Sequence, residues 1–206
     1  MLGVDFDNTI VRYDDVMYRE ARSRGVIEPC TAPSKRAIRD QIRRLPDGEL
    51  AWQQLQAIVY GSKIHEASVA PGAEAFFQAC REREIRAVIV SHKTHYARVD
   101  ETRTNLRVAA LAWMRQHRVF DRDGFGLSSA DVYFASSRQE KLAWISRLGC
   151  TAFIDDLEET FAEPDFPSDV EKILYAPHGP VSMLPSVKTV ASWQELHDVL
   201  FTPLRS

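Results

Sequence analysis

Two carboxylates lie one residue apart near the start of the chain, in the stretch Asp5-Phe6-Asp7 that follows the apolar run Leu2-Gly3-Val4. Two like charges at the end of a buried strand are unfavourable unless a cation or a proton is shared between them. A carboxylate in this position can attack phosphorus when a divalent cation screens it from the phosphoryl group. Asp5 suits this role, and Asp7 can protonate the leaving oxygen and later deprotonate the attacking water.

Two further apolar runs end in polar side chains. Ser91 follows the run 86–90, and Asp155 and Asp156 follow the run 151–154. Functional sites of parallel sheets form outside the carboxyl ends of the strands, so we expect these side chains to meet. Mg²⁺ prefers oxygen ligands in octahedral geometry, and Asp155 is favoured over Asp156 as the direct ligand from this strand end. The residue types therefore predict a magnesium site.

A phosphoryl group in transfer also needs hydrogen-bond donors and positive charge, which Ser91 and a lysine can supply. Lys141 is the favoured lysine, because Ser137 and Glu140 have the spacing of a capping box. That spacing places Lys141 in the first turn of a helix, where the helix dipole also favours anions. Lys93 is a competing candidate because it follows Ser91 closely.

Short strand-like runs alternate with helical stretches along most of the chain. This alternation predicts an α/β protein with a mainly parallel five-stranded sheet. The expected strands cover residues 2–6, 86–91, 132–134, 151–154 and 172–176, and the expected helices cover residues 71–84, 103–118, 137–149 and 192–201. The tail over residues 161–185 is expected to hold a peripheral loop, an edge strand and a Pro-rich connection.

Residues 11–68 interrupt this alternation, because they contain helical stretches at 16–25, 34–45 and 49–61 and no convincing strand. We interpret them as a small helical cap inserted after the first strand, with residues 1–10 and 69–206 forming the core domain. Arg36 and Arg43 belong to a basic run on one broad helix face of this insertion. That face is either solvated or binds an anionic substrate through its guanidinium groups.

The composition is that of an ordinary globular protein of 206 residues, with 45% hydrophobic and 27% charged residues. A formal net charge of −3 does not favour nucleic acid as a partner. No apolar run approaches the length of a membrane span, and the three cysteines lack metal spacing. We therefore expect reduced thiols, a cytoplasmic location and no membrane partner. The sequence predicts no oligomeric state.

The order of these motifs resembles the four sequence motifs of the haloacid dehalogenase-like (HAD) hydrolase superfamily. The resemblance rests on the stretch Asp5 to Thr9, on Ser91 after "RAVIV", on Lys141 and on "FIDDLEET". It implies a Rossmann-like three-layer core, Mg²⁺ dependence and a C1-type cap over residues 11–68. It also implies phosphoryl transfer through an aspartyl-phosphate.

The resemblance further implies a role for each matching residue. Asp5 would be the nucleophile, Asp7 the general acid and base with its backbone carbonyl also on the metal, Ser91 and Lys141 the phosphoryl ligands, and Asp155 a metal ligand. From the residue types alone, Asp156 or Glu159 is expected to support the metal site. Thr9, His92 and Lys93 are expected to bind substrate beside them, although His92 can also be a loop residue that faces solvent.

The sequence thus predicts a Mg²⁺-dependent phosphatase that acts on a small phosphorylated metabolite, with sugar phosphates as the favoured class. Dehalogenases share the pattern but usually lack the second aspartate, so Asp7 favours phosphate chemistry. Two alternatives stay open. A phosphomutase would return the phosphoryl group to its substrate at the same site, and a catalytically silent HAD-like module would bind a ligand or scaffold a complex.

Overall fold

The computed structural model describes residues 1–100, 103–179 and 181–201. The chain divides into two compact units. The core unit consists of Met1–Val11, Val69–Lys93 and His117–Ser206, and the second unit consists of Arg12–Ser68 and Thr94–Gln116. The second unit therefore contains a segment after the fourth strand in addition to the expected insertion.

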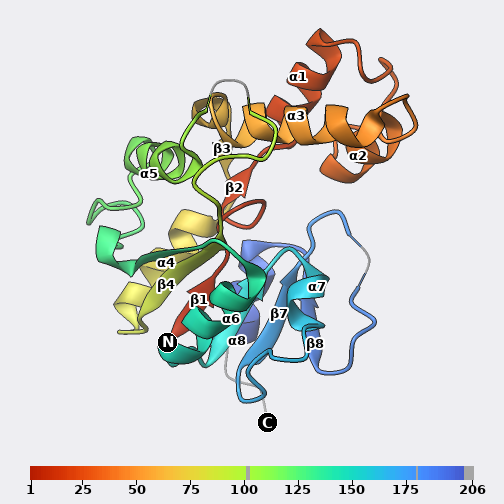
Figure 1. The fold of residues 1–206 in the computed structure, drawn as a ribbon. Helices are drawn as coiled ribbons and strands as arrows, with labels where there is room; N and C mark the ends of the chain where they lie inside the picture. The colour runs from red at the N-terminus through yellow and green to blue at the C-terminus, as the bar shows by residue number, and fades with distance from the viewer. Residues whose placement is uncertain (101–102, 180, 202–206) are drawn as a thin grey trace. The chain divides into compact units, whose positions relative to one another are not determined.

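The core unit is built on a six-stranded sheet in which every neighbouring pair is parallel (Figure 1). The strand order is β5-β4-β1-β6-β7-β8. The strands are β1 (Leu2–Val4), β4 (Ala87–His92), β5 (Val132–Ala135), β6 (Ala152–Asp155), β7 (Glu171–Tyr175) and β8 (Val187–Val190). The α/β prediction is confirmed, and β1 lies between β4 and β6, so that three polar strand ends are neighbours.

The predicted number of five strands is one too few, because the sequence did not predict β8. This strand has four residues, and its burial runs from half-buried through exposed to half-buried before the buried Val190. A strand of four residues with only two apolar side chains carries little hydrophobic signal. It takes the edge position that the sequence assigned to the segment now seen as β7.

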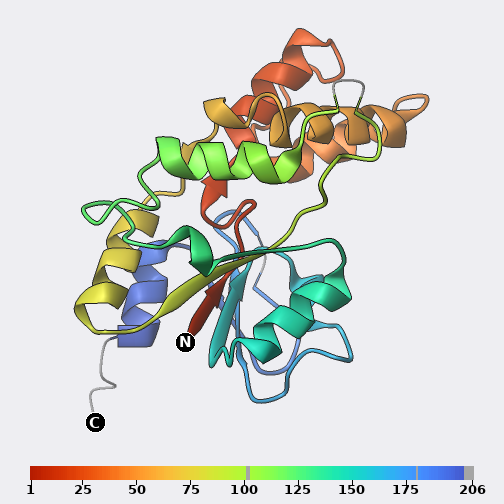
Figure 2. The same cartoon turned by 60° about the vertical axis from the view of Figure 1, so that its left-hand side comes forward.

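Helices cover both faces of this sheet (Figure 2). On one face, α4 (Ala73–Glu82) and α8 (Trp193–Phe201) pack together through the rings of Phe76 and Trp193, whose centroids are 5.0 Å apart. On the other face, α6 (Arg138–Arg147) and α7 (Glu158–Phe161) contribute Leu142, Ile145 and Phe161 to a core with Phe153 and Leu174. This is the three-layer arrangement of a Rossmann-like fold.

The second unit is helical, with α1 (Asp14–Ser23), α2 (Lys35–Ile42), α3 (Gly48–Tyr60), the short η1 (Ile64–Glu66) and α5 (Leu106–Gln116). Its buried side chains include Met17, Ile38 and Trp52. The helix α5 belongs here because the buried Trp113 donates its indole N–H to the Ala67 carbonyl at 2.9 Å. Two of the four points at which the chain passes between the units lie in paired strands of two residues each, β2 (Val11–Arg12) and β3 (Ser68–Val69).

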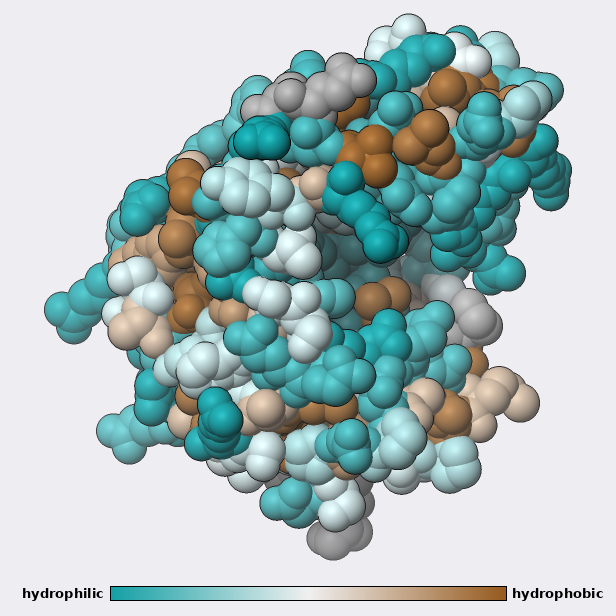
Figure 3. All heavy atoms as spheres, in the orientation of Figure 1, coloured by the Kyte–Doolittle hydropathy of each residue, from teal (hydrophilic) through white to brown (hydrophobic). Residues whose placement is uncertain are grey.

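Hydrophilic residues dominate the face of the molecule drawn in Figure 3, where hydrophobic side chains occur only in small groups. Exposed single apolar side chains such as Leu45 and Val108 are normal for a folded surface. Within the described residues, we find no helix with both the length and the apolar character needed to span a membrane.

Candidate active site

A tight turn after β1 places the two acids of the first motif. The amide groups of Ile10 and Val11 both donate to the Phe6 carbonyl, at 3.0 and 3.1 Å. Asn8 adopts a left-handed conformation with φ of 61°, which asparagine tolerates better than most residues. The indole of Trp193 also donates to the Thr9 carbonyl at 3.2 Å. The turn is therefore stabilised by its own backbone hydrogen bonds and by a hydrogen bond from α8.

Lys141 joins two of the predicted acids at the carboxyl end of the sheet. Its Nζ atom lies 2.6 Å from Asp5 Oδ1 and 2.7 Å from Asp155 Oδ2. All three side chains are at most 7% exposed. The helix that carries Lys141 begins as predicted, because Ser137 Oγ accepts from the Glu140 amide at 3.1 Å. The reciprocal bond of the capping box is shifted by one residue, since Glu140 accepts from Ser136.

Asp5, Asp155 and Asp156 form a cluster that fits a divalent cation. One carboxylate oxygen from each lies within 4.8 Å of the other two. Asp155 is fully buried and also accepts the Leu157 amide at 3.0 Å, whereas Asp156 is half-buried. Lys141 contacts two of these three carboxylates, and hard oxygen donors of this kind suit Mg²⁺. The donor set therefore fits the predicted metal.

The electrostatics of the cluster point the same way. Burial raises the pKa of the Asp5 carboxyl well above its usual range, and the Lys141 ammonium only partly offsets this. The carboxylates of Asp155, Asp156 and Asp7 raise the same pKa further. For Lys141, burial opposes the charge, but Asp155 and Asp5 outweigh it and raise the pKa. The site thus has an excess of negative charge that a bound cation would balance.

Lys93 forms an ion pair with Asp7. Its Nζ atom lies 3.0 Å from Asp7 Oδ1 and 2.8 Å from Asp7 Oδ2. The Lys93 side chain is 2% exposed and that of Asp7 is 18% exposed. The sequence presented Lys93 and Lys141 as competitors for one role, whereas in the structure Lys93 contacts Asp7 and Lys141 contacts Asp5 and Asp155.

Ser91 and Thr9 also belong to the core unit, and both side chains are buried. Among the residues that the structure describes, neither hydroxyl has a hydrogen-bond partner. Buried hydroxyls without a partner are unfavourable in a protein interior, and a bound phosphoryl oxygen would satisfy such a group. His92, the last residue of β4, is exposed. Their assignment as ligands remains a prediction.

Arg36 and Arg43 lie in the second unit, in and just after α2. The Arg36 guanidinium lies 3.8 Å from an Asp40 oxygen, and the Arg43 guanidinium lies 2.7 Å from a Glu49 oxygen. Both arginines are therefore partnered within their own unit. Their role as substrate ligands remains a prediction.

The pairing of Lys93 with Asp7 is the feature of the site that sequence reasoning missed. The available signal was the spacing of Ser91 and Lys93. Residues two apart in extended backbone share a face, and the exposed His92 stands between two residues that are 1% and 3% exposed. An alternation that continues to a lysine indicates a buried cation, which requires a carboxylate partner.

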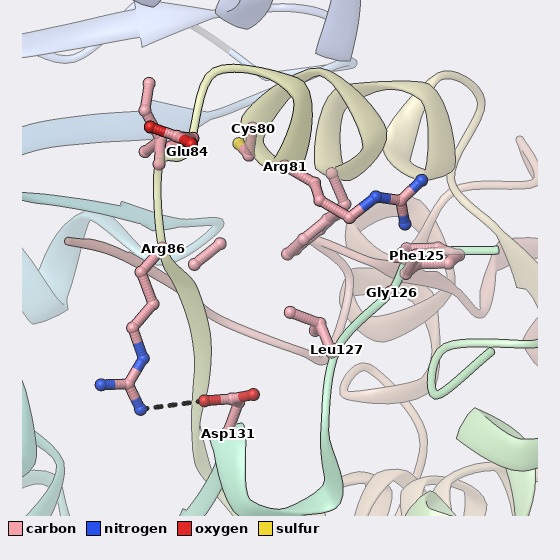
Figure 4. A pocket seen from close by; sticks show the side chains of 11 residues that line it. Cys80, Arg81, Glu84, Arg86, Phe125, Gly126, Leu127 and Asp131 are labelled. Atoms are coloured by element: carbon pink, nitrogen blue, oxygen red, sulfur yellow. Dashed lines mark hydrogen bonds and ion pairs between the residues drawn. The ribbon is translucent and has the colours of Figure 1, made fainter. Parts of the chain in front are cut away.

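A cavity of about 230 Å³ lies at the opposite, amino end of β4, between α4 and the segment 125–131 (Figure 4). Arg86 at its rim is paired with Asp131 at 3.0 Å, and Arg81 donates to the Arg122 carbonyl at 2.6 Å. Cys80 lines the cavity, but burial raises the pKa of its thiol to about 12. Among the described residues that line this cavity, we find no activated nucleophile and no cluster of three acids, so the carboxyl end of the sheet is the better candidate site.

Comparisons with known proteins found no matching family model and no matching curated protein. Solved structures do match over nearly the whole chain. A dehalogenase with an intermediate complex has a TM-score of 0.58 and 14% identity, and the match covers 97% of this chain and 96% of that one. A HAD hydrolase from Deinococcus radiodurans with bound phosphate and sodium has a TM-score of 0.54 and 13% identity, with 97% and 93% covered.

A HAD hydrolase from Bacillus subtilis bound to magnesium has a TM-score of 0.53 and 12% identity, with 97% of each chain covered. At these identities the likeness concerns the fold. The chain therefore has the fold of the HAD-superfamily hydrolases.

Proposed function

We propose that this chain is a Mg²⁺-dependent phosphatase that hydrolyses a small phosphorylated metabolite, with sugar phosphates as the favoured class. The observation that carries the proposal is the cluster of Asp5, Asp155 and Asp156, in which one carboxylate oxygen from each lies within 4.8 Å of the other two and Lys141 contacts Asp5 and Asp155. A buried excess of negative charge is costly unless it binds a cation. The phosphate, sodium and magnesium in the two HAD hydrolases described above support both parts of the proposal.

In the first half of the reaction, a carboxylate oxygen of Asp5 attacks phosphorus. The bond from phosphorus to the leaving oxygen breaks, and Asp7 donates a proton to that oxygen. Lys141 and Ser91 hold the phosphoryl oxygens, whose charge grows during transfer. In the second half, Asp7 takes a proton from water, the water oxygen attacks phosphorus, and the bond to Asp5 breaks to release phosphate.

Asp5, Asp155 and Asp156 would hold Mg²⁺, together with the backbone carbonyl of Asp7. When bound, the cation supplies positive charge that lets an anionic carboxylate approach an anionic phosphoryl group. Lys141 contributes a second positive charge, since its ammonium contacts Asp5 and Asp155 directly.

Dehalogenation is the competing reaction, because a dehalogenase is among the similar structures. In that reaction the carboxylate attacks carbon, and no proton needs to reach the leaving halide. The pairing of Asp7 with Lys93 favours phosphate chemistry, because it fixes a second acid two residues after Asp5, where it can protonate a leaving oxygen.

The test is phosphate release from a panel of phosphorylated metabolites, with and without Mg²⁺, for the wild type and for Asp5→Asn. We expect Mg²⁺-dependent release by the wild type and none by the variant. Chloride release from a haloacid would instead support a dehalogenase. Isomerisation of a sugar phosphate without phosphate release would support a mutase, and equal background rates in both proteins would support a silent binding module.

A further inference from the structure

Lys93 contacts Asp7, the residue that donates a proton in the first half of the proposed reaction and takes one from water in the second. The Lys93 ammonium contacts both oxygens of Asp7, so it opposes rotation of the carboxylate group. The two residues are 86 positions apart in the chain, and the contact joins the end of β4 to the turn after β1. Because both Asp7 oxygens lie within 3.0 Å of one ammonium, rotation of the carboxylate about its Cβ–Cγ bond would lengthen at least one of these contacts.

Contacts of both its backbone and its ammonium group fix the position of Lys93. Its backbone amide donates to the Ala135 carbonyl at 2.8 Å, which extends the pairing of β4 with β5 by one residue. Its Nζ atom lies 5.6 Å from the centroid of the fully buried Phe6 ring. An ammonium over an aromatic face is attracted to it, and the effect is larger when water is excluded. The lysine is therefore a fixed support.

The two buried lysines at this end of the sheet serve different carboxylates. Lys141 contacts Asp5 and Asp155, which belong to the cluster that fits the metal. Lys93 contacts Asp7, which takes no part in that three-carboxylate cluster. A lysine is almost never fully buried unless it is paired, so each position needs its own partner. Lys141 therefore contacts the proposed nucleophile, Asp5, whereas Lys93 contacts the proposed general acid and base, Asp7.

We propose that Lys93 is a positioning residue that fixes the Asp7 carboxylate in the orientation needed to take a proton from the attacking water. This inference rests on the proposed phosphatase function. It assigns Lys93 to the hydrolysis of the phosphorylated Asp5, whereas the expectation from sequence made it a substrate ligand. A misplacement of about 1 Å in such a group can cost on the order of 10²-fold in rate.

The test compares the wild type with Lys93→Met, which keeps the length of the side chain and removes its charge. The substrate is p-nitrophenyl phosphate, whose weakly basic leaving group departs without a proton from Asp7. We expect a burst of nitrophenolate equal to one equivalent of enzyme, followed by steady-state turnover on the order of 10²-fold slower than in the wild type. The KM should not rise.

Two controls accompany the kinetics. Lys172→Met removes a partly buried lysine that lies 4.9 Å from the Phe166 ring and donates to a carbonyl, and it should leave turnover unchanged. Lys93→Gln restores one donor toward Asp7, and it should recover part of the lost rate. A raised KM with unchanged kcat, or a slower first turnover without a burst, would overturn the inference and make Lys93 a substrate ligand.

A crystal structure of Lys93→Met, or of Lys93→Gln if the methionine variant does not fold, tests the same inference without turnover. We expect the Asp7 carboxylate to leave its present orientation while Asp5 and Ser91 stay in place. An unmoved Asp7 carboxylate would overturn the inference whether or not the wild type is active. A wild type that releases no phosphate from any compound would instead refute the proposed function, and the crystal structure would still decide the role of Lys93.

Discussion

The Nζ atom of Lys141 lies 2.6 Å from the Oδ1 atom of Asp5, and the two side chains are 3% and 7% exposed. Removing one member of such a buried pair leaves an uncompensated charge, which costs about 3–5 kcal/mol. We therefore expect Lys141→Met to lower the free energy of unfolding by about this amount and to abolish phosphate release. Urea unfolding without metal measures the first effect, and a phosphate assay measures the second.

The matched control for this prediction is Lys188→Met. Lys188 also forms an ion pair, with Glu171, but its side chain is 58% exposed. Solvent screens a pair of this kind, so its loss should change the free energy of unfolding by less than about 1 kcal/mol. A similar small change in both variants would show that the Lys141 pair is not buried in solution.

Metal binding should separate the roles of Asp155 and Asp156. Mg²⁺ that binds only the folded protein should raise the Tm of the wild type. Asp156→Asn should reduce this rise and leave the Tm without metal nearly unchanged, because the Asp156 side chain is only half-buried and its charge is better solvated than that of Asp155. Asp155→Asn should abolish the rise and also lower the Tm without metal, because it breaks the contact with Lys141 at 2.7 Å.

Thermal unfolding of the three proteins, with and without Mg²⁺, measures both effects. An Asp155→Asn variant that keeps the full Mg²⁺ shift, beside an Asp156→Asn variant that loses it, would reverse the preference for Asp155 as the direct ligand. Mg²⁺ must be the only divalent cation present in this comparison, so the buffer contains no Ca²⁺.

The parts of the fold that the sequence predicted are those with a strong local signal. Five strands and seven of the helices lie close to their expected positions because buried strands are nearly continuous apolar runs and the helices have clear periodicity. The polar ends of β1, β4 and β6 are neighbours because adjacent parallel strands end on the same edge of a sheet. The acidic cluster could therefore be predicted before any distance was known.

The parts that the sequence did not predict depend on contacts between distant residues. No local pattern tells that α5 packs with the second unit, because this follows from the bond between Trp113 and Ala67. The choice between Lys93 and Lys141 was likewise posed as a competition. In the structure, Lys93 contacts Asp7 and Lys141 contacts Asp5. The carboxylate that each lysine reaches depends on the directions of side chains from separate elements, which the sequence does not give.

The cysteines should differ sharply in their reaction with iodoacetamide. Burial raises the pKa of the Cys80 thiol to about 12, so on the order of one thiol in 10⁴ is ionised near pH 8. Burial also raises the pKa of Cys150, whereas Cys30 is exposed. We expect rapid alkylation of Cys30 alone in the folded protein and of all three cysteines in urea. Peptide mass spectrometry measures this, and rapid labelling of Cys80 in the folded protein would contradict the burial of α4.

His117 should make the protein less stable in acid. Its Nε2 atom is buried, and burial lowers its pKa below the ordinary value of 6.5. In the window between these two pKa values the unfolded chain binds more protons than the folded one, so the free energy of unfolding falls as the pH drops below about 6.5. We expect His117→Gln to lose less stability than the wild type between about pH 7.5 and pH 5, measured by urea unfolding at each pH. His65→Gln, at a side chain that is 61% exposed, should follow the wild type, and a His117→Gln profile that also does so would refute this source of acid sensitivity.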